Sequence, residues 1–281
     1  MARTYDEILD LLTPVLASSE AVEGAAIFGS RALGQADQPS DLDMVVFTAE
    51  PETLLADTRW LGSLGRIWAT TVSRDLPGLP VRRFLFDDAV QLDLLVLPSN
   101  AAEMLSGTGR HVLADMARRG FVAVKNGGPV PNGLAELGQA APRGGRPSQD
   151  EFGEVLARFW IDVVRVARRL NQDEVWDAQR IVNGPINDAL IQLQAWIMQA
   201  LRGADYDTYW GRRHLERWAG PRFEHDLAEV MARPEPDNVR QVVLQAIDLF
   251  RLQAIHAAQR WSLDYPETLD RRATIWVRNW I

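Results

Sequence analysis

Two short polar stretches, each at the end of an apolar segment, constrain the fold of this chain most strongly. The first is Gly29-Ser30-Arg31, which follows the apolar run 26–28. The second is Asp41-Leu42-Asp43, which precedes the apolar run 44–47. This order predicts a strand, a tight turn that opens a short helix, a polar loop and a second strand.

The two acidic residues at the start of the second strand are expected to act together. Side chains alternate between the faces of a strand, so Asp41 and Asp43 share one face and Leu42 lies on the other. Two neighbouring carboxylates repel each other when both are ionised. A hard cation such as Mg²⁺ removes that repulsion and prefers carboxylate and phosphate oxygens. A Gly-Ser turn also offers backbone N–H groups to phosphate. The pattern therefore predicts metal-assisted chemistry on the phosphorus of a nucleotide.

A third acidic residue lies on a later predicted strand. Residues 81–97 are typical of a hairpin with its turn at Asp87-Asp88, and its second strand contains Asp93 among apolar neighbours. Gln91, Asp93 and Leu95 share a face of that strand. A carboxylate in such a place is unusual unless it is paired or binds a metal. Asp93 is therefore a candidate metal ligand, and the alternatives are an edge-strand charge or a partner for an arginine.

The ordered set of Gly29-Ser30, Asp41-x-Asp43 and Asp93 resembles the nucleotidyltransferase superfamily of the DNA polymerase β type. The resemblance implies that Asp41, Asp43 and Asp93 are the catalytic, metal-binding residues and hold two Mg²⁺ ions. It implies that Gly29 and Ser30 contact the phosphates of the donor. Arg31 either adds a contact there or faces solvent. The resemblance also implies that the proton of the acceptor hydroxyl passes to Asp93 or to a residue of the second domain.

The rest of the chain predicts an α+β protein with two domains. Helices are expected over residues 5–18, 51–64 and 101–120, and further strands over 66–72 and 121–125. Residues 127–148 are rich in Gly and Pro and indicate a linker or lid. Beyond them, Ser148 and Glu151 form a capping-box pattern, and long apolar stripes predict helices only, with an interruption at Gly184-Pro185. We expect a nucleotidyltransferase domain with a small mixed sheet at 1–130, a linker at 131–148 and a helical substrate-binding bundle at 149–281.

This layout is similar to that of the aminoglycoside 6-adenylyltransferases and the lincosamide nucleotidyltransferases. The resemblance implies that the helical domain binds the acceptor and helps to grip the triphosphate. The acceptor candidates are Trp160, Asp162 and Glu174, followed by Glu151, Glu154 and Asp177. The phosphate candidates are Arg168 and Arg180, followed by Arg169. A solvated helix face is the alternative for each of the charged residues.

Composition narrows the partners. The formal net charge is −8, which disfavours nucleic acid as a partner and suits either a cationic small molecule or simple solubility. The chain has no cysteine, no signal-like start and no apolar run of membrane length, so we expect a cytoplasmic monomer or homodimer without a membrane partner.

The expected function is Mg²⁺-dependent transfer of AMP from ATP to a hydroxyl of an aminoglycoside such as streptomycin, with release of pyrophosphate. The alternatives are a lincosamide acceptor, a protein or RNA end as in toxin–antitoxin pairs, or a non-catalytic nucleotide-binding module.

Overall fold

The computed structural model describes residues 3–32, 34, 41–76, 79–140, 145–208 and 212–281. The chain divides into two compact units, Met1–Pro142 (unit 1) and Arg143–Ile281 (unit 2). No helix in the described ranges is both long enough and apolar enough to cross a membrane.

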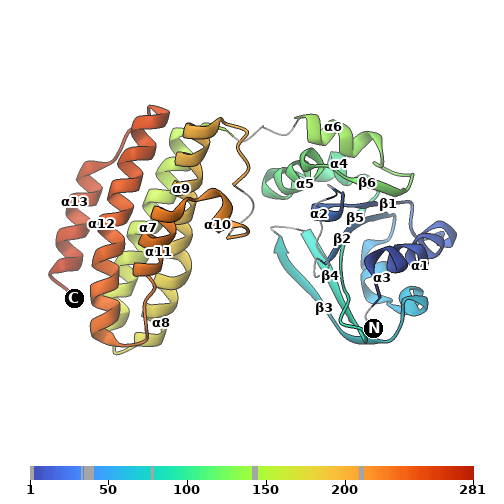
Figure 1. Cartoon of the computed structure of the whole chain (residues 1–281), viewed down its shortest axis with the longest axis horizontal. Coiled ribbons are helices and arrows are strands. Elements are labelled where there is room, and N and C mark those ends of the chain that lie inside the picture. The colour runs from blue at the N-terminus through green and yellow to red at the C-terminus, as the bar shows by residue number, and fades with distance from the viewer. Residues whose placement is uncertain (1–2, 33, 35–40, 77–78, 141–144, 209–211) are drawn as a thin grey trace. The chain divides into compact units, whose positions relative to one another are not determined.

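Unit 1 is built on one six-stranded mixed sheet (Figure 1). Its order is β3-β4-β5-β2-β1-β6, in which β2 and β5 are parallel and the other neighbours are antiparallel. The strands are β1 (Gly24–Ile27), β2 (Leu42–Thr48), β3 (Ile67–Leu76), β4 (Leu79–Phe86), β5 (Gln91–Pro98) and β6 (Val122–Lys125).

Helical segments cover both faces of this sheet (Figure 1). They are α1 (Tyr5–Ser18), α2 (Gly29–Ala32), α3 (Pro51–Ala56), the 3-10 segment η1 (Arg59–Leu64), α4 (Ala101–Met104), α5 (Gly107–Arg119) and α6 (Asn132–Ala140). On β2, Met44 packs in the layer with α1, α3 and η1, whereas Val45 and Phe47 pack in the layer with α5 and α6. The two-residue period of the strand thus sorts its side chains into two cores, as expected.

The expected helix 51–64 is in fact two shorter segments. Helix α3 ends at Ala56, and Asp57 accepts a hydrogen bond from the backbone N–H of Arg59 at 2.9 Å. An Asp side chain that binds the backbone two residues ahead favours a turn over a continuing helix. The expected helix 101–120 is likewise divided into α4 and α5.

Residues 131–148, expected as a linker, contain helix α6 within unit 1. Leu134 and Leu137 are buried against α5 at helical spacing. A Cβ atom at Gly138 would lie 2.9 Å from the backbone of Ala117, so this glycine allows α5 and α6 to pack closely. The Gly and Pro content that suggested a linker thus includes a glycine used for packing.

Unit 2 is entirely helical in its described part. Its elements are α7 (Gln149–Asn171), α8 (Val175–Ile181), the π-helical segment η2 (Val182–Ile186), α9 (Asn187–Arg202), α10 (Leu215–Trp218), α11 (Pro221–Glu229), α12 (Pro236–Trp261) and α13 (Glu267–Arg278). The Ser148–Glu151 capping box is present at the start of α7. The interruption predicted at Gly184-Pro185 is a π turn that joins α8 to α9, because Pro185 cannot donate the regular backbone bond.

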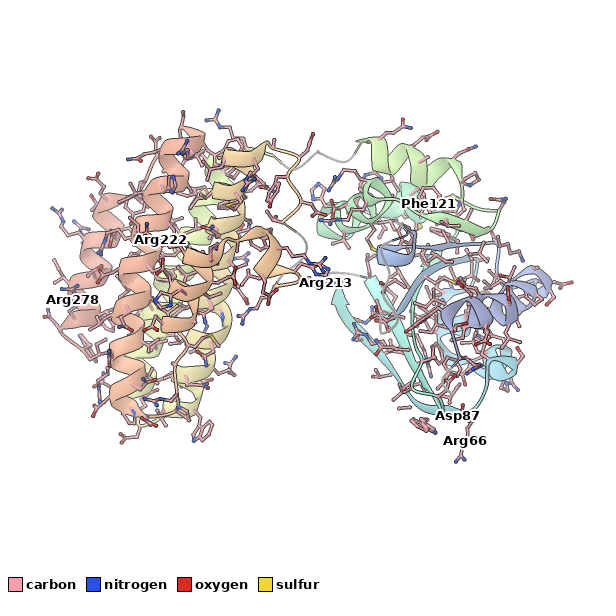
Figure 2. All side chains as sticks on the ribbon, in the orientation of Figure 1. Arg66, Asp87, Phe121, Arg213, Arg222 and Arg278 are labelled. Carbon is pink, nitrogen blue, oxygen red and sulfur yellow. The ribbon has the colours of Figure 1, made fainter. Side chains whose placement is uncertain are left out.

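One apolar core holds unit 2 together. The rings of Phe159 on α7 and Phe250 on α12 stack with their centroids 3.5 Å apart. Arg222 on α11 and Arg278 on α13, both labelled in Figure 2, have exposed side chains outside this core. The apolar stripes expected from the sequence therefore face inward.

Candidate active site

The central parallel strand pair brings two of the predicted carboxylates together. Asp43 on β2 and Asp93 on β5 are direct partners in the parallel register. Asp41 lies just before β2, and carboxylate oxygens of Asp41, Asp43 and Asp93 all lie within 4.8 Å of one another. The three side chains are half-buried, so each keeps one side open to solvent. The structure thus assembles the three residues into one cluster, here called the carboxylate cluster.

The donor atoms of the carboxylate cluster suit a hard divalent cation. All three ligands are carboxylate oxygens, which Mg²⁺ prefers, and three such charges in close proximity repel one another without a counter-charge. Asp41, Asp43 and Asp93 are the residues that would hold the ion, and their role as metal ligands stays a prediction.

The turn at Gly29 abuts this cluster. Gly29 has φ +75°, and a Cβ atom there would lie 2.8 Å from Oδ2 of Asp43. The backbone N–H of Phe28 donates to the carbonyl oxygen of Asp43 at 2.9 Å, which fixes the turn to the start of β2. Glycine is thus favoured at position 29 on two grounds, the left-handed backbone and the close approach of the Asp43 carboxylate. The side chains of Ser30 and Arg31 lie outside what the structure describes, and their phosphate contacts stay predictions.

Asp93 is held by two side chains whose role the sequence did not reveal. Arg83 on β4 donates from Nε to Oδ2 of Asp93 at 2.9 Å, and Gln91 donates from Nε2 to Oδ1 at 2.9 Å. β5 lies between β4 and β2, so the edge-strand alternative for Asp93 is wrong, whereas the arginine partner is observed. Side-chain alternation already placed Gln91 on the same face, but only the β4–β5 register identifies Arg83 as the partner.

The acidic and basic candidates of unit 2 are engaged with one another. Arg169 forms ion pairs with both Glu174 and Asp177, and Arg180 contacts Asp177 at 2.9 Å. The hydrogen bond from Arg180 lowers the pKa of the Asp177 carboxyl. These predicted acceptor and phosphate ligands therefore form one surface ion-pair network at the junction of α7 and α8.

The remaining candidates of unit 2 lie elsewhere on the bundle. Trp160 is 2% exposed and packs against Phe159 and Phe250, so we place it in the core rather than at an acceptor site. Asp162 is almost buried and binds Arg165 at 2.6 Å. The other three are accounted for as follows: Arg168 lies over the ring of Trp276, Glu151 caps α7, and Glu154 pairs with Arg158.

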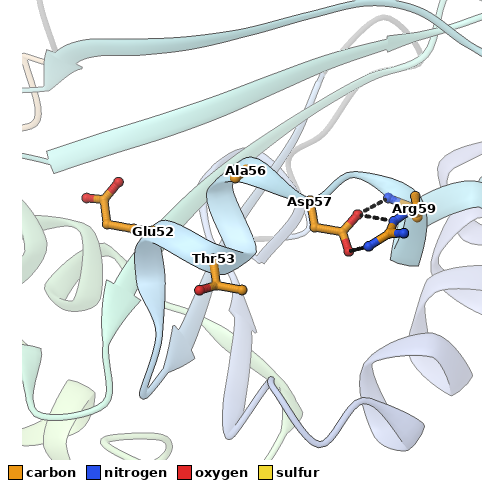
Figure 3. A pocket seen from close by; sticks show the side chains of 5 residues that line it. All are labelled: Glu52, Thr53, Ala56, Asp57 and Arg59. Carbon is orange, nitrogen blue, oxygen red and sulfur yellow. Dashed lines mark hydrogen bonds and ion pairs between the residues drawn. The ribbon is translucent and has the colours of Figure 1, made fainter.

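A separate surface hollow on unit 1 contains none of the predicted site residues. It is lined by Glu52, Thr53, Ala56, Asp57 and Arg59, and the Asp57–Arg59 ion pair spans part of it (Figure 3). The hydrogen bond from Arg59 lowers the pKa of Asp57 to about 2, which reflects this exposed pair rather than a reactive group.

Comparison with known proteins adds to this geometry. An aminoglycoside 6-adenyltransferase from Bacillus subtilis aligns with a TM-score of 0.47 and 17% identity over 99% of this chain and 98% of its own. A nucleotidyltransferase-like protein from Exiguobacterium sibiricum aligns with a TM-score of 0.40 and 10% identity over 89% of this chain and 76% of its own. No curated protein matches the sequence significantly. The sequence model of the streptomycin adenylyltransferase family matches residues 2–280, and the chain therefore belongs to that family of nucleotidyltransferase enzymes.

Proposed function

We propose that this enzyme transfers AMP from ATP to a hydroxyl of an aminoglycoside of the streptomycin type and releases pyrophosphate, with Mg²⁺ bound in the carboxylate cluster. The observation that carries the proposal is the convergence of three carboxylates within 4.8 Å at the end of the β2–β5 pair, beside the Gly29 turn. Family membership supports ATP as the donor and an antibiotic as the acceptor.

The reaction is a displacement at the α-phosphorus of ATP. The acceptor oxygen forms a bond to this phosphorus as the bond to the bridging oxygen of the β-phosphate breaks, and pyrophosphate leaves. Bound Mg²⁺ supplies stabilisation of the negative charge on the entering and leaving oxygens. Backbone N–H groups of the turn that begins at Gly29 orient the terminal phosphates. The hydroxyl proton passes to the carboxylate of Asp93.

The acidic character of the chain favours a cationic acceptor. A net charge of −8 attracts amino and guanidino groups, which aminoglycosides carry in number. The acidic candidates of unit 2, Asp162, Glu174 and Asp177, remain proposed acceptor ligands. Their present arginine partners would have to be exchanged for the ammonium or guanidinium groups of the acceptor.

The test is a panel assay with ATP, Mg²⁺ and individual aminoglycosides and lincosamides. We expect acceptor-dependent release of pyrophosphate with at least one aminoglycoside and an increase in acceptor mass by one adenylyl group. Asp41→Asn should lower this activity by about 10²-fold or more, because metal-based charge stabilisation contributes several kcal/mol. Asp10→Asn, an exposed change of the same kind on α1, is the matched control and should retain activity.

Two results would contradict the proposal in different ways. Absence of turnover with every aminoglycoside, together with turnover of a lincosamide, would reassign the acceptor. Near-normal activity of Asp41→Asn would refute the metal site in the carboxylate cluster.

A further inference from the structure

An arginine on the neighbouring strand β4, Arg83, places a positive charge beside the carboxylate cluster. Arg83 on β4 and Asp93 on β5 are direct partners in the antiparallel register, and their side chains lie 2.9 Å apart. The Arg83 side chain is 35% exposed and that of Asp93 only 13%. A second nitrogen of Arg83 donates to Oγ of Ser73 on β3 at 3.0 Å, which holds the guanidinium in place. The arginine is thus positioned from three adjacent strands.

Both oxygens of Asp93 accept a hydrogen bond within the described part of the chain. Arg83 donates one hydrogen bond to Oδ2, and Gln91 donates one to Oδ1. An ionised carboxylate has about four acceptor positions, so a metal ion can share Asp93 with these donors. Arg83 does not have to leave for the ion to bind, but its charge then lies close to that of the ion.

From this geometry we infer that Arg83 is a positioning residue that acts as the counter-charge of the metal-free carboxylate cluster. It fixes the orientation of Asp93 that turnover requires, and its positive charge weakens the affinity of the cluster for a divalent cation in the absence of nucleotide. The inference deepens the proposed function and rests on its metal site. The physical basis is that one guanidinium relieves the repulsion among three carboxylates but repels an ion that shares Asp93 with it.

The neighbouring residue offers a matched control. Arg82 lies on the opposite face of β4, where its Nε donates to Oγ1 of Thr70 at 3.1 Å and its guanidinium lies over the ring of Phe84. Replacing Arg82 changes the net charge of the protein by the same amount as replacing Arg83. Only the Arg83 change alters the charge beside the carboxylate cluster.

The test is a titration of the nucleotide-free full chain with Mn²⁺. Electron paramagnetic resonance measures the concentration of free Mn²⁺ at each point and so gives the affinity. Mn²⁺ shares the oxygen ligands of Mg²⁺ and gives a direct readout that does not depend on turnover. We expect Arg83→Gln to bind Mn²⁺ about tenfold more tightly than the wild type, from the repulsion of a divalent ion by a nearby charge at a partly exposed site. Arg82→Gln should stay within about twofold of the wild type. Arg83→Lys should do the same, because it keeps the charge.

Turnover supplies the second signature. Under the proposed function, Arg83→Gln should lower kcat about tenfold although it binds the metal more tightly, because Asp93 is less well oriented. Arg83→Lys should recover part of that loss. A residue that merely stabilises the fold would lower thermal stability without tightening Mn²⁺ binding. If Arg83→Gln does not fold, Arg83→Met keeps most of the aliphatic stem and answers the same question.

The outcomes separate the inference from the proposed function. Unchanged or weaker Mn²⁺ binding by Arg83→Gln, or equal tightening by Arg82→Gln, overturns the role of Arg83 and leaves the transferase reaction in place. Tighter binding by Arg83→Gln without any antibiotic turnover supports Arg83 and refutes the proposed acceptor. Absence of Mn²⁺ binding in every variant overturns both the inference and the metal site.

Discussion

Replacement of Gly29 by alanine tests how local backbone geometry supports the carboxylate cluster. The added Cβ would lie 2.8 Å from Oδ2 of Asp43, and position 29 has φ +75°. An L-residue in the left-handed region costs about 1–2 kcal/mol of folding stability. The carboxylate is the end of a flexible side chain, so it can retreat by about half an ångström at little further cost in stability. That retreat displaces a proposed metal ligand.

We therefore expect two separable effects of Gly29→Ala. Stability should fall by about 1–2 kcal/mol from the backbone alone. Metal affinity and turnover should fall by about tenfold or more, because a misplacement of one ångström at a reacting centre can cost about 10²-fold in rate. The assays are urea unfolding, Mn²⁺ titration and acceptor-dependent release of pyrophosphate.

Gly34→Ala is the matched control for this experiment. Gly34 has φ +67°, but a Cβ there meets no atom of the described structure within 4 Å. It should lose the same stability as Gly29→Ala while keeping Mn²⁺ affinity near that of the wild type. Equal metal affinity and equal turnover in the two variants would refute the argument that Gly29 is needed for the approach of Asp43.

Two further predictions concern ion pairs that hold each unit together. The hydrogen bond from Arg3 lowers the pKa of Asp88 to about 2, so this pair stabilises the fold above the ordinary Asp pKa and loses its effect as pH falls towards 2. Asp88→Asn should lower the free energy of unfolding by about 2 kcal/mol at pH 7 and by much less near pH 2. The control Asp87→Asn changes an exposed side chain and should alter stability little. Urea unfolding at both pH values measures the difference. On α13, burial raises the pKa of Asp270, but hydrogen bonds led by that from Arg251 on α12 hold it below its usual value. Asp270→Asn should lower the free energy of unfolding by about 2–4 kcal/mol at pH 7, because the partly buried guanidinium of Arg251 then keeps only the exposed Asp248 as a carboxylate partner. Thermal unfolding measures this loss, and an unchanged melting temperature would exclude the Arg251–Asp270 pair as an anchor of α13.

The residues of the candidate site could be selected from the sequence because each one lies at a recognisable position relative to an apolar run. Gly29 ends an apolar run, Asp41 and Asp43 begin the next, and Asp93 interrupts a third. Strand alternation then correctly placed Asp93 on the same face of β5 as Leu95. On β2 it correctly placed Met44 on the face opposite Asp43. The apolar stripes of unit 2 were equally informative, since a helix must bury such a stripe.

Other features depend on pairings that no local pattern specifies. The parallel register of β2 with β5 brings Asp43 beside Asp93, and the register of β4 with β5 selects Arg83 as the partner of Asp93. Helix α6 was not predicted, because Gly138 added to the glycine content that indicated a linker. In the structure this glycine allows close packing against α5.

The sequence by itself thus determined the chemical groups of this protein and their order, because strand alternation and turn formation are local properties of the chain. The tertiary structure decided which of those groups meet. It joined three carboxylates and one arginine at the centre of the sheet, and it placed Trp160 in the core. The physical reason is that register and burial are set by contacts between segments far apart in the chain, which a local pattern does not contain.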